Sequence, residues 1–209
     1  MARPVRFRNA IYNAAVRLFG DQGLTQTGIR EIAKLAGVSE AALYRHWKGK
    51  RELAWDIFKH GLEDLHDAMD ELVADDQPFC DTIRTIVRVF YEAYDRNPQL
   101  FGYLLLSQHE LWKAKPDSLK DPVAFWFDLL RSRTDQFQLE ETWTSEVLGP
   151  VTLGMILQPS IAAAYKSVPV PLSQHVDSVS AAICRVLGVA WDPSTANPAP
   201  IPMPPDEES

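Results

Sequence analysis

Two short amphipathic segments joined by a glycine turn place the strongest limit on how the start of this chain can fold. The first, Gly28 to Leu35, carries apolar residues at helical spacing, and Thr27 stands at its predicted N-cap position. Gly37 in the break can adopt a left-handed conformation at little steric cost. Ser39 is then expected to cap a second segment that runs to about Trp47. Behind the longer helix expected at residues 7–23, this arrangement predicts a helix-turn-helix.

Helical periodicity continues along the rest of the chain, and no alternating strand pattern of useful length interrupts it. The sequence therefore predicts an all-α fold of about nine helices. Beyond residue 50 the expected helices cover 50–74, 79–96, 99–108, 122–137, 144–166 and 172–189. We expect a three-helix domain with the helix-turn-helix, suited to DNA binding, at 1–50 and a larger helical domain at 51–190. Residues 191–209, rich in proline and acids, are predicted to be a disordered tail.

Charge is distributed unevenly along the chain. Residues 1–60 contain 11 lysines and arginines against five acidic residues, whereas the remainder contains 10 basic and 23 acidic residues. A basic head on an acidic body indicates that only one end of the molecule approaches a polyanion. Chance clustering of charges would produce the same count.

Several other classes of protein find no support in the sequence. The richest apolar run, Val147 to Tyr165, is interrupted by Gly149 and Pro159, so we expect no membrane-spanning segment. No secretory signal is predicted either. Cys80 and Cys184 lack the spacing of a metal site or a disulfide framework, which favours reduced thiols in a cytoplasmic protein. No nucleotide-binding, hydrolase or zinc-protease motif is present, so we expect no catalytic residue, metal ion or cofactor.

The run from Thr27 to Lys50 resembles the signature of the tetracycline-repressor (TetR) family, and Ala14-Ala15-x-x-Leu18-Phe19 resembles that family's first helix. The resemblance covers about residues 7–58. It implies a homodimeric regulator of transcription, by the family's habit a repressor, that binds a palindromic operator in double-stranded DNA.

The resemblance also implies residue roles on the DNA. Four positions match phosphate contacts, where hydroxyl, imidazole and ammonium groups donate to phosphate oxygens; they are Thr27, Tyr44, His46 and Lys50. Four others match positions that face base edges; they are Ser39, Ala41, Ala42 and Arg45. A guanidinium such as that of Arg45 can bridge guanine O6 and N7.

Simpler roles compete with these assignments. Thr27 can serve only as a helix cap, Tyr44 can be a half-buried packing residue, and His46 can be an ordinary surface histidine. Arg45 can contact phosphate instead of a base. Glu40 departs from the family pattern, because a carboxylate repels phosphate unless it accepts from cytosine N4.

The middle helices are rich in aromatic residues, which favours a mainly apolar cavity for a small-molecule effector. The candidate pocket residues are Phe90, Tyr94, Phe101, Leu104, Gln108, Trp112, Trp126 and Met155. Pro159, inside an expected helix, is predicted to kink it and so to help open the cavity. Most of these aromatic residues can equally belong to the core. The alternative is a TetR-like regulator that has no small ligand and is controlled by a protein partner.

The resemblance further implies a four-helix dimer interface made by the last two helices of each copy. The final helix carries an apolar stripe at helical spacing, formed by Val176, Val179, Ile183, Val186 and Leu187. Burial inside one subunit explains such a stripe equally well.

Overall fold

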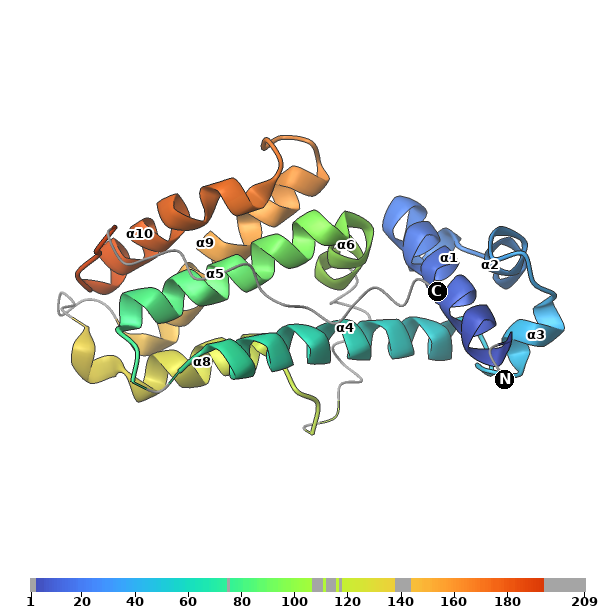
Figure 1. The fold of residues 1–209 in the computed structure, drawn as a ribbon, viewed down its shortest axis with the longest axis horizontal. Helices are drawn as coiled ribbons and strands as arrows, with labels where there is room; N and C mark the ends of the chain where they lie inside the picture. The colour runs from blue at the N-terminus through green and yellow to red at the C-terminus, as the bar shows by residue number, and fades with distance from the viewer. Residues whose placement is uncertain are drawn as a thin grey trace. The chain divides into compact units, whose positions relative to one another are not determined.

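The computed structural model describes residues 3–74, 76–106, 111, 116, 118–137 and 144–193, and this part of the chain is built from nine α-helices and two short 3-10 helices (Figure 1). The prediction of an all-α fold is confirmed. The helices are α1 (Arg3–Gln26), α2 (Ile29–Leu35), α3 (Glu40–Tyr44), α4 (Lys50–Leu72), α5 (Phe79–Arg96), α6 (Pro98–Leu106), α8 (Pro122–Ser132), η2 (Thr134–Gln136), α9 (Ser145–Ala164), η3 (Leu172–His175) and α10 (Val176–Leu187).

The helix-turn-helix forms much as its turn chemistry predicts. Gly37 has a φ of 67°, the left-handed conformation that glycine adopts without a steric penalty. Ser39 caps α3, since its Oγ accepts a hydrogen bond from the Ala42 backbone N–H at 3.2 Å. Helix α3 ends at Tyr44 rather than near Trp47 as predicted, and the Trp47 side chain is buried.

The predicted cap of α2 is wrong. Gly28, not Thr27, occupies the N-cap position. The Thr27 hydroxyl instead donates to the Gly23 carbonyl at 2.8 Å, because α1 continues past its predicted end after a break at Gly23 (φ 83°, ψ 163°). The Gly28 N–H donates to the Glu31 carboxylate at 3.5 Å, so the free amide at this end still has an acceptor.

The chain divides into two compact units. Unit 1 comprises Met1–Glu63 and Asn97–Lys120, and unit 2 comprises Asp64–Arg96 and Asp121–Ser209. Unit 1 therefore contains α6 and the first part of α4 as well as the helix-turn-helix. The domain boundary at residue 50 stays a prediction.

The core of unit 1 forms where α1 packs against α6. Gly20 permits this approach, because a Cβ there would lie 2.9 Å from the Gln99 carbonyl oxygen. The rings of Phe19 and Tyr103 stack with centroids 5.3 Å apart. The Tyr103 hydroxyl is buried and donates to the Ala54 carbonyl at 2.8 Å, so α6 is also fastened to α4.

The core of unit 2 centres on α5, which packs against α9, η3 and α10. Arg84, only 3% exposed, donates to Asp177 and Asp81, both at 3.0 Å. Its guanidinium also lies 4.2 Å from the centroid of the Trp191 ring and donates to the Asp192 carbonyl. The chain is thus held to α5 at the start of the predicted tail, while residues 194–209 of that tail lie outside the described residues.

Candidate nucleic-acid interface

The surface of α3 separates into a packing side and an open side. Leu43 is fully buried and Trp47 is 4% exposed, so both anchor the segment to unit 1. Tyr44 is 51% exposed, and Arg45 and His46 follow it as exposed residues. A phenol, a guanidinium and an imidazole therefore stand side by side at the end of α3. These groups suit phosphate oxygens and base edges.

The N-terminal end of α3 shows a similar division. Ser39 and Ala41 are exposed, as a base-facing position requires. Ala42 is only 8% exposed and lies on the packing side with Leu43. Its small side chain thus serves the interior of unit 1, and the burial argues against the predicted base contact.

Two of the predicted phosphate contacts are engaged inside the protein. Thr27 is 1% exposed, with its hydroxyl on the Gly23 carbonyl, so the side chain has no open face toward solvent. The Lys50 ammonium donates to the Thr27 carbonyl at 2.8 Å and to the Thr25 carbonyl at 3.3 Å. Lys50 thus binds the end of the α1–α2 connection to the start of α4, and its charge stands at the edge of the helix-turn-helix.

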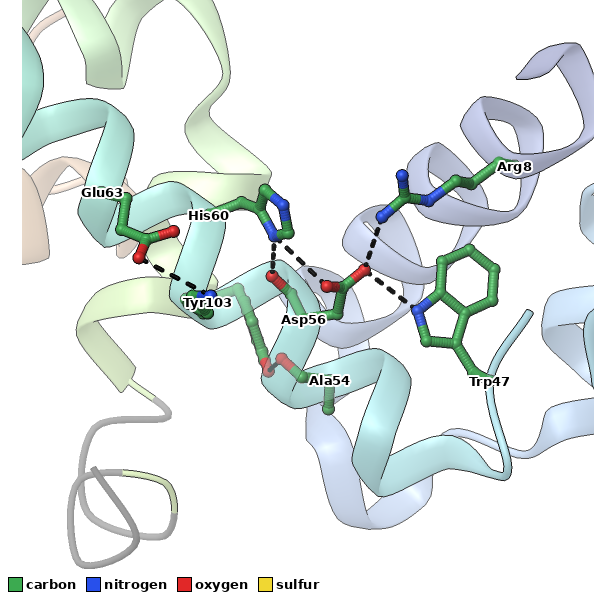
Figure 2. Close-up of polar contacts among 8 residues, drawn as sticks. Arg8, Trp47, Ala54, Asp56, His60, Glu63 and Tyr103 are labelled. Atoms are coloured by element: carbon green, nitrogen blue, oxygen red, sulfur yellow. Dashed lines mark hydrogen bonds and ion pairs between the residues drawn. The ribbon is translucent and has the colours of Figure 1, made fainter. Parts of the chain in front are cut away.

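The Asp56 carboxylate on α4 accepts hydrogen bonds from residues of α1 and of the segment that follows α3. Figure 2 shows the Trp47 indole nitrogen and the Arg8 guanidinium pointing to the same carboxylate oxygen, at 3.0 and 3.2 Å. His60, one turn further along α4, places Nδ1 at 3.3 Å from the other carboxylate oxygen and at 2.7 Å from the Asp56 carbonyl. We call Asp56, Arg8, Trp47 and His60 the Asp56 cluster. It ties α1, the end of α3 and α4 together through one carboxylate.

Glu40, which departs from the family pattern, has a basic partner. Its carboxylate lies 3.2 Å from Nε of Arg30, so an ion pair spans α2 and α3. The Arg30 side chain is 90% exposed and that of Glu40 44% exposed, so water and salt screen the pair. Arg30 reduces the repulsion that Glu40 would exert on a nearby phosphate.

The predicted effector-pocket residues fall into both units. Phe101 and Leu104 belong to unit 1, whereas Phe90, Tyr94 and Trp126 belong to unit 2, and all five are buried. Trp126 is fully buried, and its indole N–H donates to Thr152 Oγ1 at 3.2 Å, which is a packing role within unit 2.

Of the three remaining predicted pocket residues, the structure describes only Met155. Met155 is partly exposed on α9, which continues through Pro150 and Pro159 from Ser145 to Ala164. Gln108 and Trp112 lie outside the described residues. Within the described ranges, no cluster of His, Cys, Asp and Glu side chains suits a metal ion.

The predicted dimer stripe on α10 is largely occupied within its own subunit. Ile183 and Leu187 are fully buried and Val176 is 6% exposed, whereas Val179 and Val186 are partly accessible. The larger apolar surface lies on α9, where Val147 is 51% exposed and Val151 is 37% exposed.

The composition of α9 makes this exposure unusual. Over Glu146–Ala164 its mean hydropathy is 1.5, enough by length and composition alone to cross a membrane, yet only 33% of it is buried. Leu148, Thr152 and Ile156 form its buried side. An apolar helix with an open apolar side is typical of a partner surface as well as of a membrane segment.

Known proteins resemble this chain most clearly in the segment that contains α2 and α3. A sequence model of the family described as bacterial regulatory proteins, tetR family, matches residues 11–56. The match covers the helix-turn-helix segment and less than half of the chain. The match ends at Asp56, so it includes α2, α3 and the carboxylate that accepts from the Trp47 indole N–H.

Curated relatives match this chain over part of their length. The transcriptional repressor KstR2 of Rhodococcus jostii is 33% identical over 88 residues, 42% of this chain and 43% of the relative. The transcriptional regulator AcrR of Shigella flexneri is 39% identical over 61 residues, 28% of each chain. The chain thus aligns with less than half the length of these curated relatives, which are named as regulators and not as enzymes.

A solved structure shares the fold over most of the chain. The structure of the transcriptional regulator FadR from Bacillus subtilis, in complex with stearoyl-CoA, matches with a TM-score of 0.73 over 86% of this chain and 98% of that one. The sequence identity is 17%. At this identity the similarity shows the fold alone.

Sequence reasoning missed Asp56 and Arg30. Both are charged residues in the basic head, but no motif marks them, because their partners lie on other helices. The nearest signal is the large aromatic side chain of Trp47, which favours packing but does not indicate the acceptor for its indole N–H.

Proposed function

We propose that this protein is a sequence-specific regulator of transcription of the TetR type, and that it acts as a repressor. It inserts α3 into the major groove of a palindromic operator. The observation that carries the proposal is the division of the α3 segment. Tyr44, Arg45 and His46 stand open to solvent while Leu43 and Trp47 hold the segment in place. A short projecting helix with an open polar side is the element that reads base edges in this motif.

Charge supports the same orientation. The first 60 residues carry an excess of positive charge, whereas the rest of the chain is acidic. DNA therefore attracts the helix-turn-helix end and repels the remainder. We assign base readout to Arg45, with Ser39 and Ala41 beside it, and phosphate contacts to Tyr44, His46 and Lys50.

We propose a homodimer whose interface includes the open side of α9. Val147 and Val151 lie one turn apart there, and Val179 and Val186 on α10 add partly accessible apolar surface. In a two-fold dimer the same patch meets itself, so an apolar patch is self-complementary. The two recognition helices would then contact half-sites about 34–36 Å apart, one turn of DNA. This arrangement removes the exposed apolar side of α9 from water in a cytoplasmic protein, so the helix needs no membrane.

The effector we propose is an apolar or aromatic small molecule bound in unit 2. Phe90, Tyr94 and Trp126 give the interior of unit 2 an aromatic character, and the structurally similar FadR was solved with stearoyl-CoA. Ligand must favour a dimer geometry that no longer fits successive major grooves. The second candidate is control by a protein partner without a small ligand. The hydrogen-bonded packing of Trp126 against Thr152 favours it, because a packed core leaves less room for an effector.

The proposal can be tested by selecting binding sites from a random pool of duplex DNA with the purified full chain, followed by sequencing. The expected result is one palindromic motif with half-sites about 10 base pairs apart. Recovery of unrelated sequences, with binding that depends on salt alone, would contradict sequence-specific regulation. Thermal-shift measurements with lipophilic ligands then separate the two modes of control, since only the first predicts ligand stabilisation.

A further inference from the structure

We propose that Arg30 on α2 binds a guanine in the operator, and that Glu40 on α3 holds the Arg30 guanidinium in place for this contact. The inference rests on the operator binding proposed above and adds to it a base contact from outside α3. Glu40 is then a positioning residue, which accounts for a carboxylate on a surface proposed to face DNA.

The ion pair places Arg30 beside the open side of α3. Nε of Arg30 lies 3.2 Å from Oε1 of Glu40, the first residue of that helix. Glu40 and Tyr44 stand one turn apart, so they share one side of α3, and Tyr44 is 51% exposed. The Arg30 guanidinium is therefore held next to the side of α3 on which Tyr44 is open to solvent.

The geometry of the pair leaves the outer part of the guanidinium open. A guanidinium carries several N–H donors in a rigid fork, and the closest contact of the Glu40 carboxylate is to Nε. The Arg30 side chain is 90% exposed, so its outer amino groups face solvent. Such a fork can bridge O6 and N7 of guanine, the commonest specific contact to a base.

Charge balance favours a base edge over a phosphate as the partner of Arg30. Arg30 and Glu40 together carry no net charge, so the pair adds little to the general attraction between protein and DNA. A phosphate close to Arg30 would also meet the Glu40 carboxylate and be repelled by it. Guanine O6 and N7 are neutral acceptors, so hydrogen bonds to them carry no such penalty.

Glu40 also restricts a long side chain before DNA binds. An exposed arginine samples many rotamers, and fixing it on a base removes that freedom. The ion pair removes part of it in advance, although water and salt weaken the pair at this exposure. We therefore expect Glu40 to affect how well the guanine is distinguished, with little effect on the overall affinity for DNA.

The test is fluorescence anisotropy of the full chain on its selected operator and on duplexes that carry each single base-pair change. Arg30→Ala should lower the preference for guanine about tenfold at one base pair, separate from the one assigned to Arg45. Arg30→Lys should lower it to a similar extent, because an ammonium keeps the charge but lacks the fork. If Arg30→Lys discriminates like the native chain, or if Arg30→Ala weakens all duplexes equally, Arg30 contacts phosphate and the proposal fails.

Glu40→Gln separates positioning from direct contact with a base. It should lower the same guanine preference, by less than Arg30→Ala does, while the overall affinity stays equal or rises because a negative charge is removed. In the Arg30→Ala background it should change no base preference further. An unchanged guanine preference in Glu40→Gln, or a cytosine preference that Glu40→Gln removes and Arg30→Ala retains, would overturn the positioning role.

A matched pair of charges on α1 serves as the control. Arg17 and Asp21 lie 3.9 Å apart, both side chains are exposed, and both residues belong to unit 1. Arg17→Ala and Asp21→Asn should leave every base preference unchanged, since they alter the same charges on another helix. An equal loss of guanine preference in Arg17→Ala would assign the effect to charge alone and overturn the proposal. Failure of the native chain to select any palindrome would instead contradict the proposed function, so the two failures are distinguishable.

Discussion

Helices α3 and α9 both leave a substantial surface open, but the two surfaces differ in chemistry. Around the end of α3, the exposed residues Tyr44, Arg45 and His46 offer hydrogen bonds and positive charge. On α9, the exposed Val147 and Val151 offer only apolar area. Polar groups at the first surface remain well hydrated without a partner, whereas apolar area at the second is stabilised by removal from water. The comparison supports the proposals that α3 contacts a polyanion and that α9 contacts a second copy of the chain.

The largest expected effect comes from placing charge on the α9 surface. The double variant Val147→Glu, Val151→Glu should leave the fold of each chain unchanged, because both side chains are exposed there. In a two-fold interface it should destabilise the dimer by about 3–5 kcal/mol or more, since unpaired charges would be buried. Analytical ultracentrifugation measures the result, with Glu146→Gln as a control on the same helix. A dimer of native affinity would remove α9 from the interface.

Next in size is the loss of base readout by α3. Arg45→Ala should weaken operator binding by about 1–3 kcal/mol and relax preference at one base pair, if the guanidinium bridges a guanine. Fluorescence anisotropy over single-base operator variants measures this pattern. Arg131→Ala, an exposed arginine outside unit 1, serves as the control. A uniform loss across all sequences would instead reassign Arg45 to phosphate.

A smaller effect is expected beneath α3, in the Asp56 cluster. The bond from the Trp47 indole to the Asp56 carboxylate, at 3.0 Å, is removed by Trp47→Phe and weakened by Asp56→Asn. A double-mutant cycle should give a coupling free energy of about 1 kcal/mol in urea unfolding. Coupling near zero would mean that Asp56 only screens the Arg8 charge.

The last prediction concerns the stability of unit 2 at alkaline pH, and no change in stability is expected at neutral pH. Burial raises the pKa of Cys184 from 9.0 to about 12, with a further contribution from Cys80, and burial also raises the pKa of Tyr91 and Tyr94. All three groups are neutral in the folded state, so their contribution to stability is complete below about pH 9 and is lost as the pH rises toward about 12.

Urea midpoints across this alkaline range should fall less steeply for Tyr91→Phe than for the native chain. The Cys184 thiol should also resist alkylation at neutral pH until the protein unfolds, because the thiolate is the reactive form. Labelling of Cys184 in the folded protein at the rate of a free thiol would show that this interior is open.

The sequence predicts the helix-turn-helix well because its signals are local. Gly37 and Ser39 act through their own backbone neighbourhood, and the structure confirms the left-handed turn and the cap. Thr27 was misassigned because its hydroxyl had two acceptable partners, and the continuation of α1 past Gly23 decided between them. Ala42 illustrates the same limit. A small residue fits either a base contact or a packing position, and burial alone distinguishes them.

Longer-range features could not be inferred in this way. The stripe on α10 identified an apolar side of the helix but not what covers it, and Ile183 and Leu187 prove to be buried in their own subunit. Helix α9 is apolar on nearly all sides, so periodicity indicates no preferred face. The Asp56 cluster joins residues from α1, α4 and the segment that connects α3 to α4, and no spacing rule relates Arg8 to Trp47 and Asp56.

The most direct test of the account is the affinity of the native chain for its selected palindrome compared with the same duplex in which one half-site is scrambled. A dimer that reads both half-sites through α3 should bind the intact palindrome by at least about 3 kcal/mol more tightly, with two chains per duplex. Equal affinity for the two duplexes at physiological salt, or one chain per palindrome, would contradict both the reading role of α3 and the dimer formed through α9.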